Sequence, residues 1–397
     1  MTEGLAAADR LGYVLVTPLG PEDGGDFGPR TPGTRTAGIQ EAVDAACATG
    51  RNLFISGVQG AGRFVYRSQE TIYIPPRQGF RIDGGQYVVS FEGTTGDALC
   101  IDSCMDCAYR FGLITSPADG AVVRFAPRAP VPIDGMTVLT DSVFEFSSLV
   151  GGGRFDLQLK RVVQPPRGAG ILLDATRGSI VYNRIFAVAV LLCETGVAFE
   201  SGPGSVAHNH IHVLHNHQNA VGLRMGTEDT RPGAVAFNRL DLSLNAEDVP
   251  DAVGAVVAGR GNVLTLDSAR MAPGRDVVLT AGARDNVIHA LSAPSGVTRL
   301  SPPAGNRILA PTPGGFALAS PPVPPSGTIA TNEHHGPVEV LILDSGDASA
   351  WTLGDAAGTA QRVQAAPRVG ERFLLEPGAG LGFEFTSPPT WRWRALS

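Results

Sequence analysis

Residues 276–288 read DVVLTAGARDNVI: a short apolar run, a turn containing glycine, an asparagine, and an aliphatic residue two positions after it. The pattern of asparagine followed two positions later by an aliphatic residue recurs at Asn183, Asn209, Asn238, Asn262, Asn286 and Asn306. The differences between these residue numbers are 26, 29, 24, 24 and 20. One unit of short strands and tight turns per roughly two dozen residues predicts a parallel β-helix.

We expect each of these asparagines to lie in the same turn of its coil. Asparagine is one of the few residues besides glycine that tolerates the left-handed backbone conformation such a turn can require. If the coils stack, the side-chain amides lie above one another and can form hydrogen bonds. The repeat therefore predicts a ladder of asparagines along the β-helix.

A short helix is predicted in front of the repeats, within residues 25–57, GDFGPRTPGTRTAGIQEAVDAACATGRNLFISG. Thr36 is suited to the N-cap position. Ile39, Ala42, Val43 and Ala46 follow at the spacing of one helical face. Such a helix would cover the end of the β-helix core, where strands would otherwise be left unpaired.

This segment, followed by YRSQETIYIPP at 66–76, resembles the opening of pectate-lyase-like right-handed parallel β-helix proteins. In those proteins an acidic-aromatic-glycine segment leads to a threonine-rich turn, a short helix and a strand that ends at prolines. The resemblance extends from Asp26 to Pro311 and implies the fold only. Arg35 and Thr36 replace the family's usual pair of aspartates, and the catalytic motifs of polygalacturonases and pectate lyases are absent. No catalytic residue is carried over.

The expected fold class is all-β, a right-handed parallel β-helix with an N-terminal cap helix and a small C-terminal β-sandwich. We place an N-terminal segment at 1–25, the β-helix at 26–310, a proline-rich linker at 311–327 and the C-terminal β domain at 328–397. That last part contains short strands separated by glycine, aspartate and proline turns. Its layout is similar to the terminal domains of β-helical tailspikes and related trimers, which implies a homotrimer.

The composition supports a β-rich chain and limits its partners. The 50 glycines and 30 prolines among 397 residues favour short strands and turns over helices. A net charge of −7 argues against nucleic acid and suits an uncharged sugar or a neutral or cationic small molecule. No apolar run approaches the length of a membrane span, and no signal peptide is visible. We expect no membrane partner and a cytoplasmic protein, or a secreted one if a leader was removed.

Residues 205–218, SVAHNHIHVLHNHQ, hold five of the eight histidines: His208, His210, His212, His215 and His217. If Ile211 and Val213 point into the core, strand alternation places His210 and His212 on the outer face and His215 and His217 in the following turn. A zinc site needs three or four converging ligands, and no acidic residue of this segment supplies a third. We therefore expect no metal and no cofactor. The histidines could contact a sugar, take part in catalysis or form a solvated polar face.

Carboxylates are the better candidates for chemistry. Glycoside cleavage uses two carboxyl groups about 5–10 Å apart, and adjacent coils of a β-helix stack about 4.8 Å apart. The candidates are Asp134, Asp141, Glu145, Asp174 and Glu194, which we expect to form one strip on successive coils. Arg184 could stabilise a developing negative charge. Each acid could instead cap backbone amides in a turn.

The sequence thus predicts an enzyme that cleaves or rearranges glycosidic bonds through paired carboxylates. A glycoside hydrolase, a fructotransferase-like enzyme and a polysaccharide lyase all fit this description. Two alternatives remain at this point: a non-catalytic, tailspike-like carbohydrate-binding trimer, and an isomerase or cyclase of a small metabolite built on the same scaffold. Fold alone does not decide among them.

Overall fold

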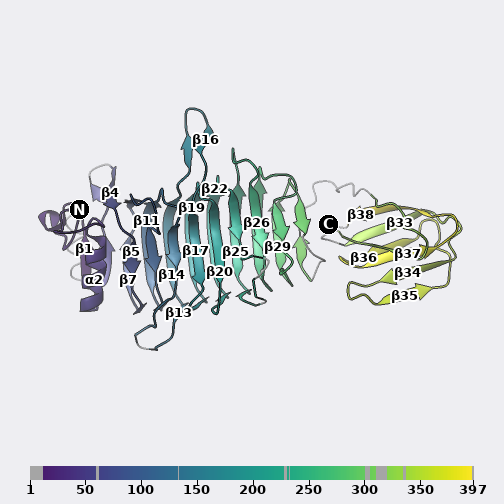
Figure 1. The fold of residues 1–397 in the computed structure, drawn as a ribbon, viewed down its shortest axis with the longest axis horizontal. Coiled ribbons are helices and arrows are strands. Elements are labelled where there is room, and N and C mark those ends of the chain that lie inside the picture. The colour runs from purple at the N-terminus through teal and green to yellow at the C-terminus, as the bar shows by residue number, and fades with distance from the viewer. Residues whose placement is uncertain are drawn as a thin grey trace.

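The computed structural model describes residues 12–59, 62–132, 134–227, 230–231, 233–299, 305–309, 320–333 and 337–395. Three parallel sheets wind into a β-helix, which a small antiparallel β-sandwich follows in the chain (Figure 1). The all-β class is confirmed. No helix within the described ranges is long and apolar enough to cross a membrane. Residues 311–319 of the expected linker lie outside these ranges, and the expected cytoplasmic location stays a prediction.

Sheet 1 is the largest of the three sheets of the β-helix. Its strands are β1 (Tyr13–Val16), β2 (Asn52–Ile55), β3 (Val58–Gln59), β4 (Gly62–Ser68), β7 (Arg81–Gly84), β8 (Tyr87–Phe91), β11 (Ala108–Thr115), β14 (Val143–Val150), β19 (Arg184–Leu191), β22 (His210–His217), β25 (Arg239–Asn245), β27 (Val263–Ala269), β29 (Val287–Ser292) and β31 (Arg307–Leu309). Sheet 2 contains β5 (Ile72–Ile74), β9 (Leu99–Ile101), β12 (Ala121–Phe125), β17 (Ala169–Ala175), β20 (Thr195–Ser201), β23 (Val221–Arg224), β26 (Val253–Val257), β28 (Val277–Leu279) and β30 (Val297–Arg299).

Sheet 3 is built from short strands. They are β6 (Arg77–Gln78), β10 (Cys104–Met105), β13 (Val138–Thr140), β18 (Ser179–Val181), β21 (Val206–Ala207) and β24 (Val235–Ala236). In the central coils the chain passes from sheet 3 to sheet 1 to sheet 2 and back, and each strand pairs in parallel with its equivalent in the next coil.

The aliphatic residue of each repeat lies in the core between the three sheets. Strand register aligns these positions in one row, and each of them is at most 3% exposed. The row contains Ile185, Ile211, Leu240, Leu264, Ile288 and Ile308. The repeat read from the sequence is therefore the inward-facing side of sheet 1.

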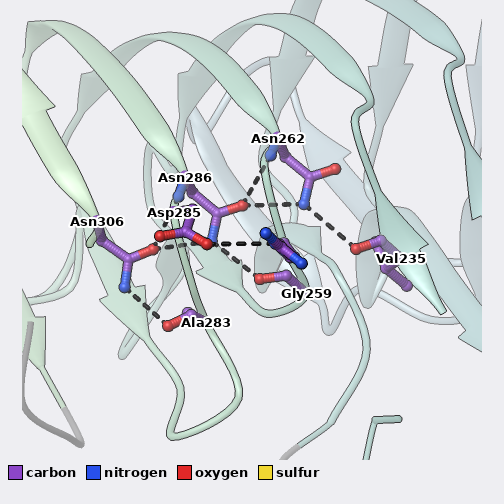
Figure 2. A network of polar contacts seen from close by, with 8 residues as sticks. Val235, Gly259, Asn262, Ala283, Asp285, Asn286 and Asn306 are labelled. Atoms are coloured by element: carbon purple, nitrogen blue, oxygen red, sulfur yellow. Dashed lines mark hydrogen bonds and ion pairs between the residues drawn. The ribbon is translucent and has the colours of Figure 1, made fainter. Parts of the chain in front are cut away.

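The predicted asparagine ladder is confirmed. All six asparagines are buried, and the Nδ2 of each donates to the Oδ1 of the next at 2.9–3.0 Å. The same Oδ1 also accepts the backbone N–H of the preceding asparagine, as in Asn262 to Asn286 at 2.9 Å. The second Nδ2 hydrogen reaches a backbone carbonyl, for example that of Gly259 from Asn286 (Figure 2). The ladder thereby satisfies polar groups that burial would otherwise leave unpaired.

The left-handed conformation falls one residue earlier than we expected. Tyr182, His208, Phe237 and Asp285, each directly before a ladder asparagine, have φ of 59°, 57°, 55° and 53°. The asparagines themselves have negative φ, and their side chains are buried. The preceding residue makes the turn and directs its side chain outward.

Helix α2 (Ile39–Thr49) packs against β1, β2 and β5 at the N-terminal end of the core. The four residues predicted for its inner face are buried, as expected. The Oγ1 of Thr36 accepts the N–H of Gln40 at 3.0 Å, but the N-cap residue is Gly38, with φ 86°. A 3-10 helix, η1 (Gly20–Asp23), precedes it.

The β-helix begins earlier than the boundary expected at Asp26. Strand β1, YVLV, pairs in parallel with β2 from Tyr13 onward and is buried throughout. A short, wholly apolar strand carries no alternation, so it did not stand out in the sequence.

The C-terminal part is an antiparallel sandwich, as predicted. One sheet holds β32 (Ile329–Thr331), β34 (Ala350–Gly354), β35 (Ala360–Val363) and β37 (Gly380–Glu384), and the other holds β33 (Val338–Asp344), β36 (Arg372–Leu375) and β38 (Thr390–Ala395). Phe383, Trp391 and Trp393 lie in the core between them.

Replacing Asn238 by alanine should destabilise the β-helix. The change leaves the amides of Asn209 and Asn262 without their ladder partner, at about 1–3 kcal/mol for each buried group left unpaired. Gln158→Ala, which truncates an exposed amide, is the matched control. Denaturant unfolding should show a large decrease in midpoint for Asn238→Ala alone; equal midpoints for the two variants would refute the role of the ladder.

Candidate functional site

The outer face of sheet 1 is hollowed where the sheet forks. Strand β7 pairs with the first residues of β11, at Ala108 and Tyr109, whereas β8 pairs with its last residues, Leu113 to Thr115. Between β7 and β8 the chain turns away at Gly85, whose φ of 154° is accessible only to glycine. A Cβ on the preceding Gly84 would lie 2.7 Å from the Ile55 carbonyl oxygen. The two glycines therefore keep the fork open.

The resulting hollow has a volume of about 910 Å³. Phe54 and Phe186 contribute aromatic rings from the outer face of sheet 1, whereas the rings of Phe111 and Phe146 are buried in the core beneath it. Charged and polar groups lie among them. The lining includes Tyr13, Phe54, Phe111, Phe146, Phe186, Val188, Ser56, Ser147, Gln86, Asp83, Arg110 and Glu145. This combination of apolar surface with a few polar groups is typical of ligand sites.

Strand register places the charged residues of the hollow in one outward-facing row. Phe54 pairs with Asp83, Arg110 with Glu145, and Glu145 with Phe186. Asp83 follows Ile82, which pairs with Tyr109, so Asp83 stands beside Arg110. With about 4.8 Å between strands, Asp83 and Glu145 are about 10 Å apart along the row.

Hydrogen bonds hold both carboxylates in place. The Tyr13 hydroxyl donates to Asp83 Oδ2 at 2.6 Å, and Arg110 Nε donates to Glu145 Oε2 at 2.8 Å. Burial, followed by the hydrogen bond to Asp83, raises the pKa of Tyr13, so this phenol stays a donor. The hollow thus contains two oriented carboxylates with an arginine between them.

The five carboxylates chosen from the sequence do not form one strip, and that expectation was wrong. Glu145 lies in the hollow, but Asp174 is on sheet 2, and Asp141 and Glu194 are exposed at the corners on either side of sheet 1. Asp134 is exposed in the turn between β12 and β13. Spacing along the chain estimates which coil a residue occupies, but not which of three faces it lies on.

Asp174 is held by hydrogen bonds that stabilise the fold. Its carboxylate is buried, accepts Arg124 Nη1 at 2.9 Å and binds the backbone N–H and the hydroxyl of Thr176. Arg124 also donates to Asp97 at 2.7 Å. Burial alone would raise the pKa of Asp174, but the hydrogen bonds from Thr176 and Arg124 outweigh it and lower the pKa.

Two of the five histidines occupy the outer face of sheet 1, as alternation predicted. His212 packs edge-to-face on Phe186, with ring centroids 5.5 Å apart, and His210 Nε2 lies 2.9 Å from Asp241 Oδ2. Asp241 also accepts a hydrogen bond from Arg239 Nε. Burial alone would raise the pKa of Asp241, but the hydrogen bond to His210 and its other polar partners outweigh burial and lower the pKa.

Of the other three histidines, His215 and His217 also lie on β22 of sheet 1, where Asn216 between them is buried, and His208 lies at the corner before the strand. His215 and His217 belong to β22 and not to a following turn, so that prediction was wrong. The pairing of β22 with β25 is irregular between Val213 and Asn216, and the alternation of buried and exposed residues shifts there. Burial and then the neighbouring His215 lower the pKa of His217. His208 stacks between Tyr182 and Phe237 at the corner, with centroids 4.9 and 5.2 Å away.

Arg184 begins β19 and pairs with His210, which pairs with Arg239. It is exposed and lies two residues before Phe186 of the hollow. In the parts of the chain that are described, no three histidine, cysteine or carboxylate side chains are grouped closely enough to hold a metal ion.

Sequence reasoning missed Tyr13, Asp83 and Arg110. The segment RIDGG at 81–85 offered a signal, because an acid directly before two glycines marks a chain reversal beside a charged group. Comparison with known proteins found no matching family profile and no curated protein of significant similarity.

Asp174→Asn should destabilise the fold by roughly 1–3 kcal/mol at neutral pH, because the Arg124 guanidinium loses a charged partner. The lowered pKa means that the carboxylate stabilises the fold above its unfolded-state pKa of about 3.9 and ceases to do so as the pH falls through the folded value. The stability difference between wild type and variant should therefore shrink below about pH 4. Glu194→Gln, at an exposed carboxylate, is the control, and a pH-independent difference for Asp174→Asn would contradict this account.

Proposed function

We propose that this protein is a carbohydrate-active enzyme that hydrolyses a glycosidic bond in the hollow of sheet 1. The observation that supports the proposal is the pair of carboxylates, Asp83 and Glu145, oriented by Tyr13 and Arg110 in a hollow that Phe54 and Phe186 also line. Aromatic faces pack well against the apolar faces of sugar rings, and glycosidases use two carboxyl groups.

The strand positions of the two carboxylates, about 10 Å apart, favour one mechanism. Two strand spacings of about 4.8 Å each allow a water molecule to fit between a carboxylate and the sugar, as inverting hydrolysis requires. The shorter separation of retaining enzymes, about 5 Å, corresponds to adjacent strands, a position that Arg110 occupies instead. The expected product therefore has the inverted anomeric configuration.

The contacts suggest a role for each acid. Asp83 accepts a hydrogen bond from the Tyr13 hydroxyl, which suits a carboxylate acting as the base toward water. In this scheme Glu145 takes the other role: it enters the reaction protonated and gives its proton to the leaving oxygen, while Arg110 holds its Oε2. Water then loses its proton to Asp83, its oxygen bonds to the anomeric carbon, and the glycosidic bond breaks as Glu145 protonates the departing oxygen.

The row of outward side chains continues beyond the hollow. Glu145 pairs with Phe186, Phe186 with His212, and His212 with Asp241. Arg184, His210 and Arg239 form a parallel row two residues earlier on the same strands. An extended oligosaccharide lying along the β-helix axis could contact both rows, which makes His210, His212 and Arg184 substrate-binding candidates in this proposal.

Glu145→Gln and Asp83→Asn should each lower the rate of hydrolysis by about 10²–10⁴-fold, the usual effect of removing a general acid or base. Purified protein would be incubated with neutral and acidic oligosaccharides, with mass spectrometry used to distinguish hydrolysis, elimination and transfer. Glu194→Gln, outside the hollow, is the control and should keep full activity.

An activated aryl glycoside separates the two roles. Its leaving group needs no proton, so Glu145→Gln should recover much of its rate while Asp83→Asn should not. Binding of an oligosaccharide without turnover would instead support the non-catalytic alternative. Turnover that survives both substitutions would exclude these two residues from catalysis.

A further inference from the structure

The outward row of side chains that runs through the hollow is closed at its N-terminal end. Strand register begins this row at Leu15 on β1, which pairs with Phe54 on β2. Alternation with Val14 and Val16, which lie in the core, points Tyr13 and Leu15 away from the core. Even so, Leu15 is only 3% exposed and Tyr13 only 8%. Protein therefore covers the outer face of sheet 1 at β1.

The side chains of Tyr13, Leu15 and Phe54 form an apolar cluster separate from the core, which we call the end wall. The rings of Tyr13 and Phe54 meet edge to face with centroids 6.3 Å apart, and both line the hollow. The Tyr13 hydroxyl reaches Asp83 on β7, across strand β2 that lies between them. The end wall thus stands directly beside one of the two carboxylates.

The opposite end of the row is open. Beyond the hollow, register continues the row on β22, β25, β27 and β29, and none of its side chains on these strands is buried. They are His212, Asp241, Thr265 and His289. An extended sugar chain can therefore lie along the row from the C-terminal side, but it has to stop at the end wall.

We propose that the enzyme removes sugar from the end of a chain and does not cut its interior, an inference that rests on the proposed hydrolysis in the hollow. The cleavage point lies near Arg110, midway between Asp83 and Glu145 in the row. From Arg110 to Phe54 is two strand spacings, about 10 Å. This space holds a monosaccharide or a disaccharide. Each turnover adds one water across one glycosidic bond and releases that short product.

The size of the first products tests the proposal on the full chain. Hexasaccharides of glucose, xylose, fructose and galacturonic acid are the probes, and mass spectrometry identifies the products at low conversion. Only a monosaccharide or a disaccharide, with the complementary shortened chain, should be found. Trisaccharides at this stage would show cleavage in the middle of the chain, which would overturn the proposal and leave hydrolysis itself intact.

Two phenylalanines of the same row provide a matched pair of variants. Phe54→Ala removes part of the end wall and should shift the first products toward longer fragments. Phe186→Ala, the control, removes a ring from the open side of the hollow; it should weaken substrate binding and leave the product size unchanged. The same product sizes from Phe54→Ala and wild type would overturn the end wall as the limit on product length.

Binding distinguishes a failure of this inference from a failure of the proposed hydrolysis. The slow variant Glu145→Gln would be titrated with the same hexasaccharides, either unmodified or carrying a bulky fluorophore at the reducing or the non-reducing end. The end wall should reject one labelled form, with binding about tenfold weaker or more, and the open end should accept the other. Equal binding of both labelled forms would overturn the proposal even without turnover. Neither binding nor turnover with any probe would refute the proposed function as well.

Discussion

The hydrogen-bonded row of buried asparagines is the interaction on which the rest of the structure depends. In each of these coils the backbone bends at the corner before sheet 1. Each bend buries backbone N–H and C=O groups that then need hydrogen-bond partners. The amides of Asn183 through Asn306 pair with one another and with the adjacent carbonyls, so the corner stays satisfied from coil to coil. Since a misplaced coil would break several such bonds, the ladder also aligns strands β19 to β31 of sheet 1.

This regular stacking has a chemical consequence on the outside. Once the inward residues of sheet 1 are in register, so are the outward ones, and side chains from distant parts of the sequence form straight rows. Asp83 and Glu145 are 62 residues apart by subtraction, yet they stand two strands apart in one row. The hollow arises where this regularity fails, at the glycines between β7 and β8, because an uninterrupted sheet presents a flat surface. Regular stacking supplies the alignment, and the fork supplies the concavity.

The same geometry separates groups that the sequence appears to join. Asp174 and Glu145 occupy the same coil, but Asp174 faces outward from sheet 2 and is committed to Arg124. The histidine-rich segment is likewise divided between a corner, the outer face of sheet 1 and the far end of β22. Dense clusters in the sequence become dispersed in a fold whose coils have three faces.

The sequence by itself determined the class of fold, the asparagine ladder, the buried face of helix α2 and the outward orientation of His210 and His212. These follow from local periodicity, because the inward or outward direction of a side chain is set by its neighbours in the chain. Only the tertiary structure decided the site. Which face a carboxylate occupies depends on the lengths of the turns between sheets, and the fork depends on how β7 and β8 share β11. Tyr13, Asp83, Arg110 and Glu145 meet because three long connections return to one sheet, and no local pattern encodes that return.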